Sequence, residues 1–153
     1  MLTPGTPAPD FTLSSTFNEK TSFKDFKGKP IILVFYPADN TPVCTNQLAL
    51  YNEIKEQGLF EDYEAQIFGI SVDNIEKHRN FSQQLNLSFP LLADDNPHAE
   101  ITRKFGVYDE KTGISKRALF VIDQNGNIHW SYVSPINENP GADGIFEALD
   151  SLN

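Results

Sequence analysis

The chain has 153 residues, 39% of them hydrophobic, and a net charge of −9. This length fits one domain with a sizeable core, and the acidic balance argues against nucleic acid or an anionic membrane as a partner, because phosphate binding requires clustered Lys and Arg. We see no signal-peptide pattern and no apolar run of the roughly 18 residues that a membrane span needs, so we expect a single domain, residues 1–153, in the cytoplasm.

The first half of the chain alternates predicted strands and helices. Residues 10–23 predict a short hairpin, and the near-continuous apolar run 31–36 is typical of a central strand covered on both faces. Between 43 and 58, apolar residues recur every three to four positions until a glycine, which predicts an amphipathic helix. The run 67–72 predicts a second buried strand.

The third quarter of the chain predicts shorter elements. Asp73, with Glu76 three residues on, resembles a capping box and predicts the start of a helix. Residues 89–92 predict a short strand. Asn96-Pro97 predicts the start of a short helix that ends at Gly106, because proline suits the first helical position. We expect a surface turn at 108–112.

The last quarter of the chain predicts a hairpin and a closing helix. Asn125-Gly126 lies between the strand runs 118–123 and 127–133, and this dipeptide favours a tight hairpin turn. Asn139-Pro140 predicts the start of the last helix. The whole order predicts an α/β fold with a central mixed sheet, helices on both faces and an N-terminal hairpin, which is typical of a thioredoxin-like fold.

The single cysteine, Cys44, lies near the predicted start of the helix that follows the first long strand. A free thiol, with a pKa of about 8.5, is mostly protonated at neutral pH, and only the thiolate is a good nucleophile. Helix N–H groups and the helix dipole favour the thiolate, the dipole alone typically by about 0.3–1 kcal/mol. This is less than one pKa unit, so it is not sufficient to make the thiolate the main form at neutral pH. Arg117 could add positive charge, because strand ends and helix starts gather at one edge of an α/β sheet. Thr41 could bond the sulfur or an incoming oxygen.

Each of these residues also has a purely structural interpretation. Cys44 could be a small buried hydrophobe, and Arg117 a solvated charge at a strand end. Thr41 could simply cap the helix, while Pro37 and Pro42 stop the strand and start the helix. Their occurrence together favours a reactive thiol over these separate explanations.

The spacing Pro37-x-x-x-Thr41-x-x-Cys44 is the signature of the peroxiredoxins, and the chain resembles this family, the AhpC/TSA superfamily, along nearly its whole length. The subgroup that it resembles most is the one named for bacterioferritin comigratory protein, here in a one-cysteine form. The segments that carry the resemblance, besides the signature, are 4–11, 34–37, 69–73, 89–94 and 117–123.

The resemblance implies a thiol-dependent peroxidase. The Cys44 thiolate would attack hydrogen peroxide or an alkyl hydroperoxide and become sulfenic acid. Arg117, Thr41 and the N–H of Cys44 would bind the peroxide oxygens, and Pro37 would shield the sulfur from bulk water. The family implies no metal and no organic cofactor.

Two positions depart from the family pattern. Ala49 stands where many members of the subgroup have a resolving cysteine, so reduction would need an external thiol: thioredoxin, glutaredoxin or a low-molecular-weight thiol. Gln47 stands where the family usually has a glutamate that orients the arginine. We expect Gln47 to bond Arg117 at the substrate-binding site without neutralising it, which favours the Cys44 thiolate.

Alternatives remain open at this level. A non-enzymatic peroxide sensor or redox scaffold would share the first chemical step, whereas a thiol–disulfide oxidoreductase is disfavoured because a second cysteine is missing. Monomer and homodimer are both compatible with the pattern. Trp130 and Tyr132 predict packing or a subunit contact. His78, His98 and His129 predict ordinary surface or half-buried histidines without zinc-ligand spacing.

Overall fold

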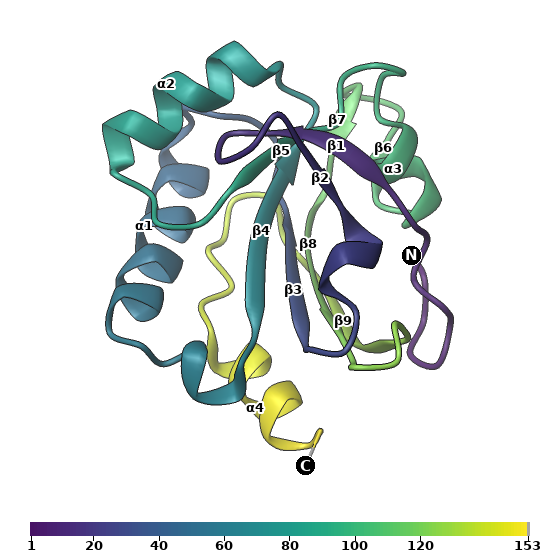
Figure 1. Cartoon of the computed structure of the whole chain (residues 1–153). Coiled ribbons are helices and arrows are strands. Elements are labelled where there is room, and N and C mark those ends of the chain that lie inside the picture. The colour runs from purple at the N-terminus through teal and green to yellow at the C-terminus, as the bar shows by residue number, and fades with distance from the viewer. Residues whose placement is uncertain (153) are drawn as a thin grey trace.

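A seven-stranded mixed sheet runs through the computed structural model, which describes residues 1–152 (Figure 1). The strand order is β2-β1-β5-β4-β3-β8-β9. The central strand β3 is parallel to β4 and antiparallel to β8, and β1 pairs with β2 as the predicted N-terminal hairpin. The strands are β1 (Thr12–Ser15), β2 (Lys20–Ser22), β3 (Ile31–Phe35), β4 (Gln66–Ser71), β5 (Leu91–Ala93), β8 (Arg117–Ile122) and β9 (Ile128–Ser134).

Helices cover both faces of this sheet, as the sequence predicts. One face packs against α1, α2 and α4, and the other against α3 and the 3-10 turn η1. In Figure 1, α1 and α2 lie on one side of the sheet and α3 on the other. The helical elements are η1 (Phe23–Phe26), α1 (Pro42–Glu56), η2 (Glu61–Tyr63), α2 (Ile75–Leu85), α3 (Glu100–Lys104) and α4 (Asp143–Asp150). Within residues 1–152, none of the helices combines the length and the apolar character that a membrane crossing requires.

The central strand separates two hydrophobic cores, because successive side chains of a strand point to opposite faces. Ile32 and Val34 of β3 contribute to the core beneath α1, while Ile31, Leu33 and Phe35 contribute to the core beneath α3. All five side chains are buried, which explains the continuous apolar run in the sequence.

The register between β3 and β8 positions the end of the central strand. Phe35, the last residue of β3, pairs with Ala118, the second residue of β8. Arg117 therefore lies at the sheet edge where the chain leaves β3 and enters α1. Arg117 lies about sixty residues after α1 in the sequence, but the antiparallel pairing of β3 with β8 brings it close to the start of α1.

Asp73 does not cap α2, contrary to the sequence prediction. The N-cap is Asn74, whose side chain accepts a hydrogen bond from the Lys77 N–H at 2.9 Å. The Asp73 carboxylate is occupied elsewhere, because it accepts bonds from Ser71 Oγ at 2.6 Å and from the Asp39 N–H at 2.8 Å. A tertiary contact has thus replaced the local one.

Two helices begin later than predicted, since both Asn-Pro pairs lie ahead of the helix that they were expected to start. Ala99 has a left-handed backbone, with φ of 59°, so α3 begins only at Glu100. Gly141 has φ of 68°, and α4 begins at Asp143. Neither backbone conformation belongs in a right-handed helix.

The turn expected at 108–112 is present at residues 110–113, but it joins two short strands that the sequence did not predict. The predicted strand at 89–92 begins later, since β5 starts at Leu91. The two short strands are β6 (Tyr108–Asp109) and β7 (Ile114–Ser115). Two-residue strands of this kind are too short to show a period in the sequence.

Candidate active site

Cys44 is the third residue of α1. It is fully buried, and its thiol is free. Thr41 occupies the N-cap position, and Pro42 opens the helix. The first intrahelical acceptor is the Thr41 carbonyl, which takes the N–H of Thr45 at 2.9 Å. The N–H groups of the first turn have no helical acceptor, so they and the dipole favour an anion at this point.

The Arg117 guanidinium reaches the sulfur from β8. Its Nη1 lies 3.3 Å from Cys44 Sγ and 2.8 Å from Gln47 Oε1. Its Nε and Nη2 donate to the carbonyl of Ile136 at 3.2 and 2.9 Å. Bonds on two sides therefore fix the guanidinium plane, and one N–H is aimed at the sulfur.

The charge of Arg117 is buried without a carboxylate partner. The residue is 2% exposed, and no Asp or Glu side chain of residues 1–152 lies within 4.0 Å of its nitrogens. Its oxygen acceptors, Gln47 and the Ile136 carbonyl, are neutral. A buried cation that lacks a counter-ion is costly, so an anion at Cys44 Sγ would be stabilised.

A directed chain of hydrogen bonds orients Gln47. Its Nε2 donates to Tyr51 Oη at 3.2 Å, and Tyr51 donates to the carbonyl of Gly141 at 2.8 Å. Burial raises the pKa of Tyr51 to about 12, with smaller opposing effects from Gln47 and Arg117, so this hydroxyl remains a donor at neutral pH. With its nitrogen engaged by Tyr51, Gln47 presents its oxygen to Arg117.

The loop between β3 and α1 holds Pro37 and Thr41. Pro37 is buried, and Thr41 is half-buried. The Thr41 hydroxyl donates to the carbonyl of Ala38 at 3.0 Å and bonds neither the helix nor the sulfur. Of the two partners that the sequence allowed for Thr41, the sulfur is therefore not bonded here. This donation leaves the lone pairs of its oxygen able to accept an O–H group from a substrate.

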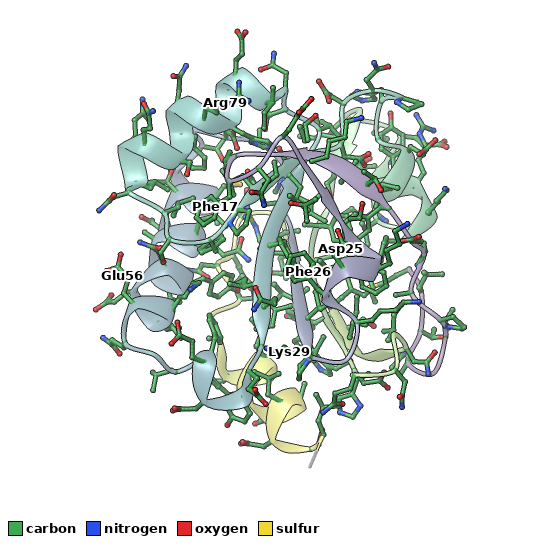
Figure 2. The ribbon with its side chains drawn as sticks, viewed as in Figure 1. Phe17, Asp25, Phe26, Lys29, Glu56 and Arg79 are labelled. Atoms are coloured by element: carbon green, nitrogen blue, oxygen red, sulfur yellow. The ribbon has the colours of Figure 1, made fainter. Side chains whose placement is uncertain are left out.

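Arg117 is the arginine that the fold brings to this site. Arg79 is exposed on the outer surface of α2, as Figure 2 shows, and exposed Arg103 lies 3.9 Å above the ring of Tyr108. The sequence pattern pointed to Arg117 through its place before a strand. It carried no signal for Ile136, whose carbonyl acts only through its backbone.

One histidine differs from the expectation of an ordinary surface or half-buried residue. His98 is exposed and His129 is half-buried, but His78 is completely buried. Its Nδ1 lies 2.7 Å from Oδ2 of Asp39, a residue of the loop that precedes α1. The sequence interval between Asp39 and His78 has no motif that would have predicted this contact.

Comparison with known proteins identifies the family of this chain. Residues 4–131, which include Pro37, Thr41, Cys44, Gln47 and Arg117, match the AhpC/TSA family. Chloroplastic peroxiredoxin Q of Sedum lineare is 33% identical over 152 residues, which cover 99% of this chain and 80% of that protein.

Solved structures give the same result over the whole chain. Peroxiredoxin Q of Xanthomonas campestris superposes with a TM-score of 0.84 and 26% identity, covering 97% of both chains. Peroxidoxin BcpB of Mycobacterium tuberculosis superposes with a TM-score of 0.88 and 25% identity, covering 100% of this chain and 99% of that one. On the family match, the relatives and the shared thioredoxin-like fold, this chain belongs to the AhpC/TSA family, the peroxiredoxins.

Proposed function

We propose that this chain is a one-cysteine peroxiredoxin, which reduces hydrogen peroxide and organic hydroperoxides at the expense of an external thiol. One observation carries the proposal. The buried Arg117 guanidinium lies 3.3 Å from Cys44 Sγ, and within residues 1–152 it has no carboxylate partner. This arrangement favours a thiolate, which is the form that attacks peroxides.

The first step would be a displacement at oxygen. The Cys44 thiolate forms an S–O bond with one peroxide oxygen while the O–O bond breaks. The bonding pair leaves with the other oxygen, which takes a proton and departs as water or an alcohol. Arg117 Nη1 and the first-turn N–H groups of α1 face the region where this negative charge develops. Cys44 is left as sulfenic acid.

The second half of the cycle would need thiols from outside the chain. Cys44 is the only cysteine in the sequence, and Ala49 is exposed on α1. An external thiol would displace water from the sulfenic acid and form a mixed disulfide, and a second thiol would release Cys44. Thioredoxin, glutaredoxin and low-molecular-weight thiols are the candidate reductants.

The experiment is peroxide consumption by wild type and Cys44→Ser, first with dithiothreitol and then with a thioredoxin system. Multiple turnovers by wild type that are lost in Cys44→Ser support the enzyme. A single equivalent consumed by wild type, without turnover under either reductant, favours the peroxide sensor instead. No consumption by wild type contradicts both.

The location and assembly of the chain are further proposals. Thiol-dependent turnover suits a reducing compartment, and we propose the cytoplasm. A homodimer is supported by the edge strand β9, where the rings of Trp130 and Tyr132 stack at 6.2 Å and Tyr132 is 42% exposed. Sedimentation equilibrium of wild type and Tyr132→Ser distinguishes a dimer through this edge from a monomer.

A further inference from the structure

A buried polar cluster lies beneath the loop that leads to Cys44. Tyr36 and His78 are completely buried, and Asp39 is 3% exposed. Tyr36 donates to Asp39 Oδ1 at 2.6 Å, and His78 Nδ1 lies 2.7 Å from Asp39 Oδ2. Groups this polar are costly to bury unless they are paired, and the proposed reaction steps above use neither His78 nor Asp39.

Both nitrogens of His78 are engaged. Nε2 lies 3.0 Å from the carbonyl oxygen of Leu92, which can only accept, so Nε2 carries a proton. One further proton lies between Nδ1 and the Asp39 carboxyl group. Whichever atom holds that proton, the pair is neutral overall, and His78 connects α2 and β5 to the loop through Asp39.

Asp39 is also the main attachment of this loop. Within the described residues, the hydrogen bonds that join residues 37–41 to β3, β4 or α2 and their adjoining turns all involve Asp39. Its side chain bonds Tyr36 and His78, and its N–H donates to Asp73 Oδ2 at 2.8 Å. The Thr41 hydroxyl bonds Ala38 inside the same loop. Asp39 therefore provides the hydrogen bonds that attach the loop to the sheet and to α2, while Thr41 continues into α1.

The cluster does not present an open metal site. One atom from each of Asp39, Asp73 and His78 lies within 4.8 Å of the others. However, these atoms bond to each other, to Ser71 and to Lys77. They hold the loop rather than face an unfilled space.

We propose that His78 is a positioning residue of the peroxidase reaction, which acts through Asp39 to hold loop 37–41 in place over Cys44. Its polar contacts within the described residues are with Tyr36, Asp39 and Leu92, and none is with Cys44. By fixing Asp39, it would fix two residues of the same loop: Pro37, which the family resemblance expects to shield the sulfur, and Thr41, whose hydroxyl oxygen is free to accept a hydrogen bond from a peroxide. This inference rests on the proposed function, because the loop would affect the reaction of Cys44 with peroxide and not the general reactivity of its thiolate.

Two substitutions of His78 separate its two contacts. In His78→Asn, the amide nitrogen falls near the position of Nδ1, so the donor toward Asp39 is kept and the bond to Leu92 is lost. In His78→Gln, the nitrogen falls near Nε2, so the bond to Leu92 is kept and the contact with Asp39 is lost. We expect His78→Gln to slow sulfenic acid formation on the order of tenfold or more, and His78→Asn to slow it about threefold or less.

The readout is the ratio of two rates at Cys44, measured at the same pH. Reaction with hydrogen peroxide needs the loop, whereas alkylation by iodoacetamide needs only an accessible thiolate. We expect the peroxide-to-alkylation ratio to fall in His78→Gln and to remain near the wild-type value in His78→Asn. Thermal unfolding is recorded in parallel, with Thr102→Val as a control, because Thr102 is buried and bonds only Asp94 through its side chain.

The outcomes are distinguishable. Equal ratios in wild type, His78→Asn and His78→Gln, or a drop that Thr102→Val shares, would overturn the inference and leave only a role in stability. If wild type itself does not react with peroxide, the proposed function fails first. If His78→Gln does not fold, Tyr36→Phe removes a single O–H from Asp39. A lower ratio in Tyr36→Phe then supports the inference, and an unchanged ratio refutes it.

Discussion

Arg117 is held from two sides, and a further N–H of its Nη1 faces Cys44. The Ile136 carbonyl accepts two of its bonds and Gln47 accepts another, so the guanidinium does not need to reorganise when charge develops on sulfur or oxygen. A planar fork with several fixed donors is specific to arginine, since lysine has a compact ammonium on a flexible stem. The charge and the geometry of this residue are therefore separable experimentally.

Arg117→Lys tests that separation. The ammonium keeps the positive charge, but it cannot bond Ile136, Gln47 and the sulfur in the same arrangement. We expect sulfenic acid formation to slow on the order of a hundredfold, with a smaller effect on alkylation by iodoacetamide, because one preorganised donor is typically worth that much. Stopped-flow rates for both reagents measure this difference. Equal losses for the two reagents would refute a geometric role.

Gln47 gives the second prediction at this scale. Gln47→Glu places a carboxylate against Arg117, which then has a counter-ion other than the Cys44 sulfur. We expect a lower thiolate fraction at neutral pH, measured by the ultraviolet absorbance of the thiolate. Tyr51→Phe is a suitable control, because it breaks the same hydrogen-bond chain without adding charge. An unchanged or higher thiolate fraction in Gln47→Glu would show that the neutral amide of Gln47 does not favour the Cys44 thiolate.

At the scale of elements, the apolar period predicted β3, β8 and α1, since their burial is nearly complete or one-sided. Local sequence patterns failed where a tertiary contact decides the structure. Asp73 had the local pattern of a cap, but its carboxylate accepts a hydrogen bond from the Asp39 N–H, and Asn74 caps α2 instead. A single sequence contains no signal for such competition between a local and a distant partner.

The Asp73 contact implies an acid dependence. Burial acts to raise the pKa of Asp73, but hydrogen bonds from Ser71, Lys77 and the Asp39 N–H outweigh it and hold the pKa below its usual value of 3.8. The lowered pKa means that the contribution to stability is complete above the usual value and is lost as pH falls through the lower, folded value.

We therefore expect the urea midpoint of wild type to fall more steeply than that of Asp73→Asn as pH is lowered from neutral to below about 4. Equilibrium unfolding across this range measures both slopes. Lys77→Met serves as the matched variant, since it removes one of the partners that lower this pKa and should give an intermediate slope. Parallel curves for wild type and Asp73→Asn would contradict the assignment.

At the scale of the whole molecule, the sequence predicted the site because the topology follows from the order of elements. A central strand, a following helix and an antiparallel strand that begins with arginine bring Cys44 and Arg117 to one edge, and the Phe35–Ala118 register realises this. The sequence could not predict His78 or Ile136, because the first depends on where α2 packs and the second on a loop carbonyl.

The sequence contains no second cysteine, and this affects the fate of the oxidised protein as a whole. Cys44 sulfenic acid has no internal thiol to capture it, so further oxidation competes directly with the external reductant. We expect excess hydrogen peroxide without thiol to add two or three oxygens to the chain, and dithiothreitol to suppress the addition. Peptide mapping should locate these oxygens on Cys44, whereas oxygens found only on Met1 would contradict this reading.

The most direct test of the central claim, that Cys44 beside Arg117 is a peroxide-reactive thiolate, is intact mass after one equivalent of hydrogen peroxide with dimedone present. We predict one dimedone adduct on wild type and none on Cys44→Ser, because dimedone captures sulfenic acid. An unmodified wild-type mass, with the peroxide still in solution, would contradict a peroxide-reactive thiolate and leave Cys44 as a buried apolar residue.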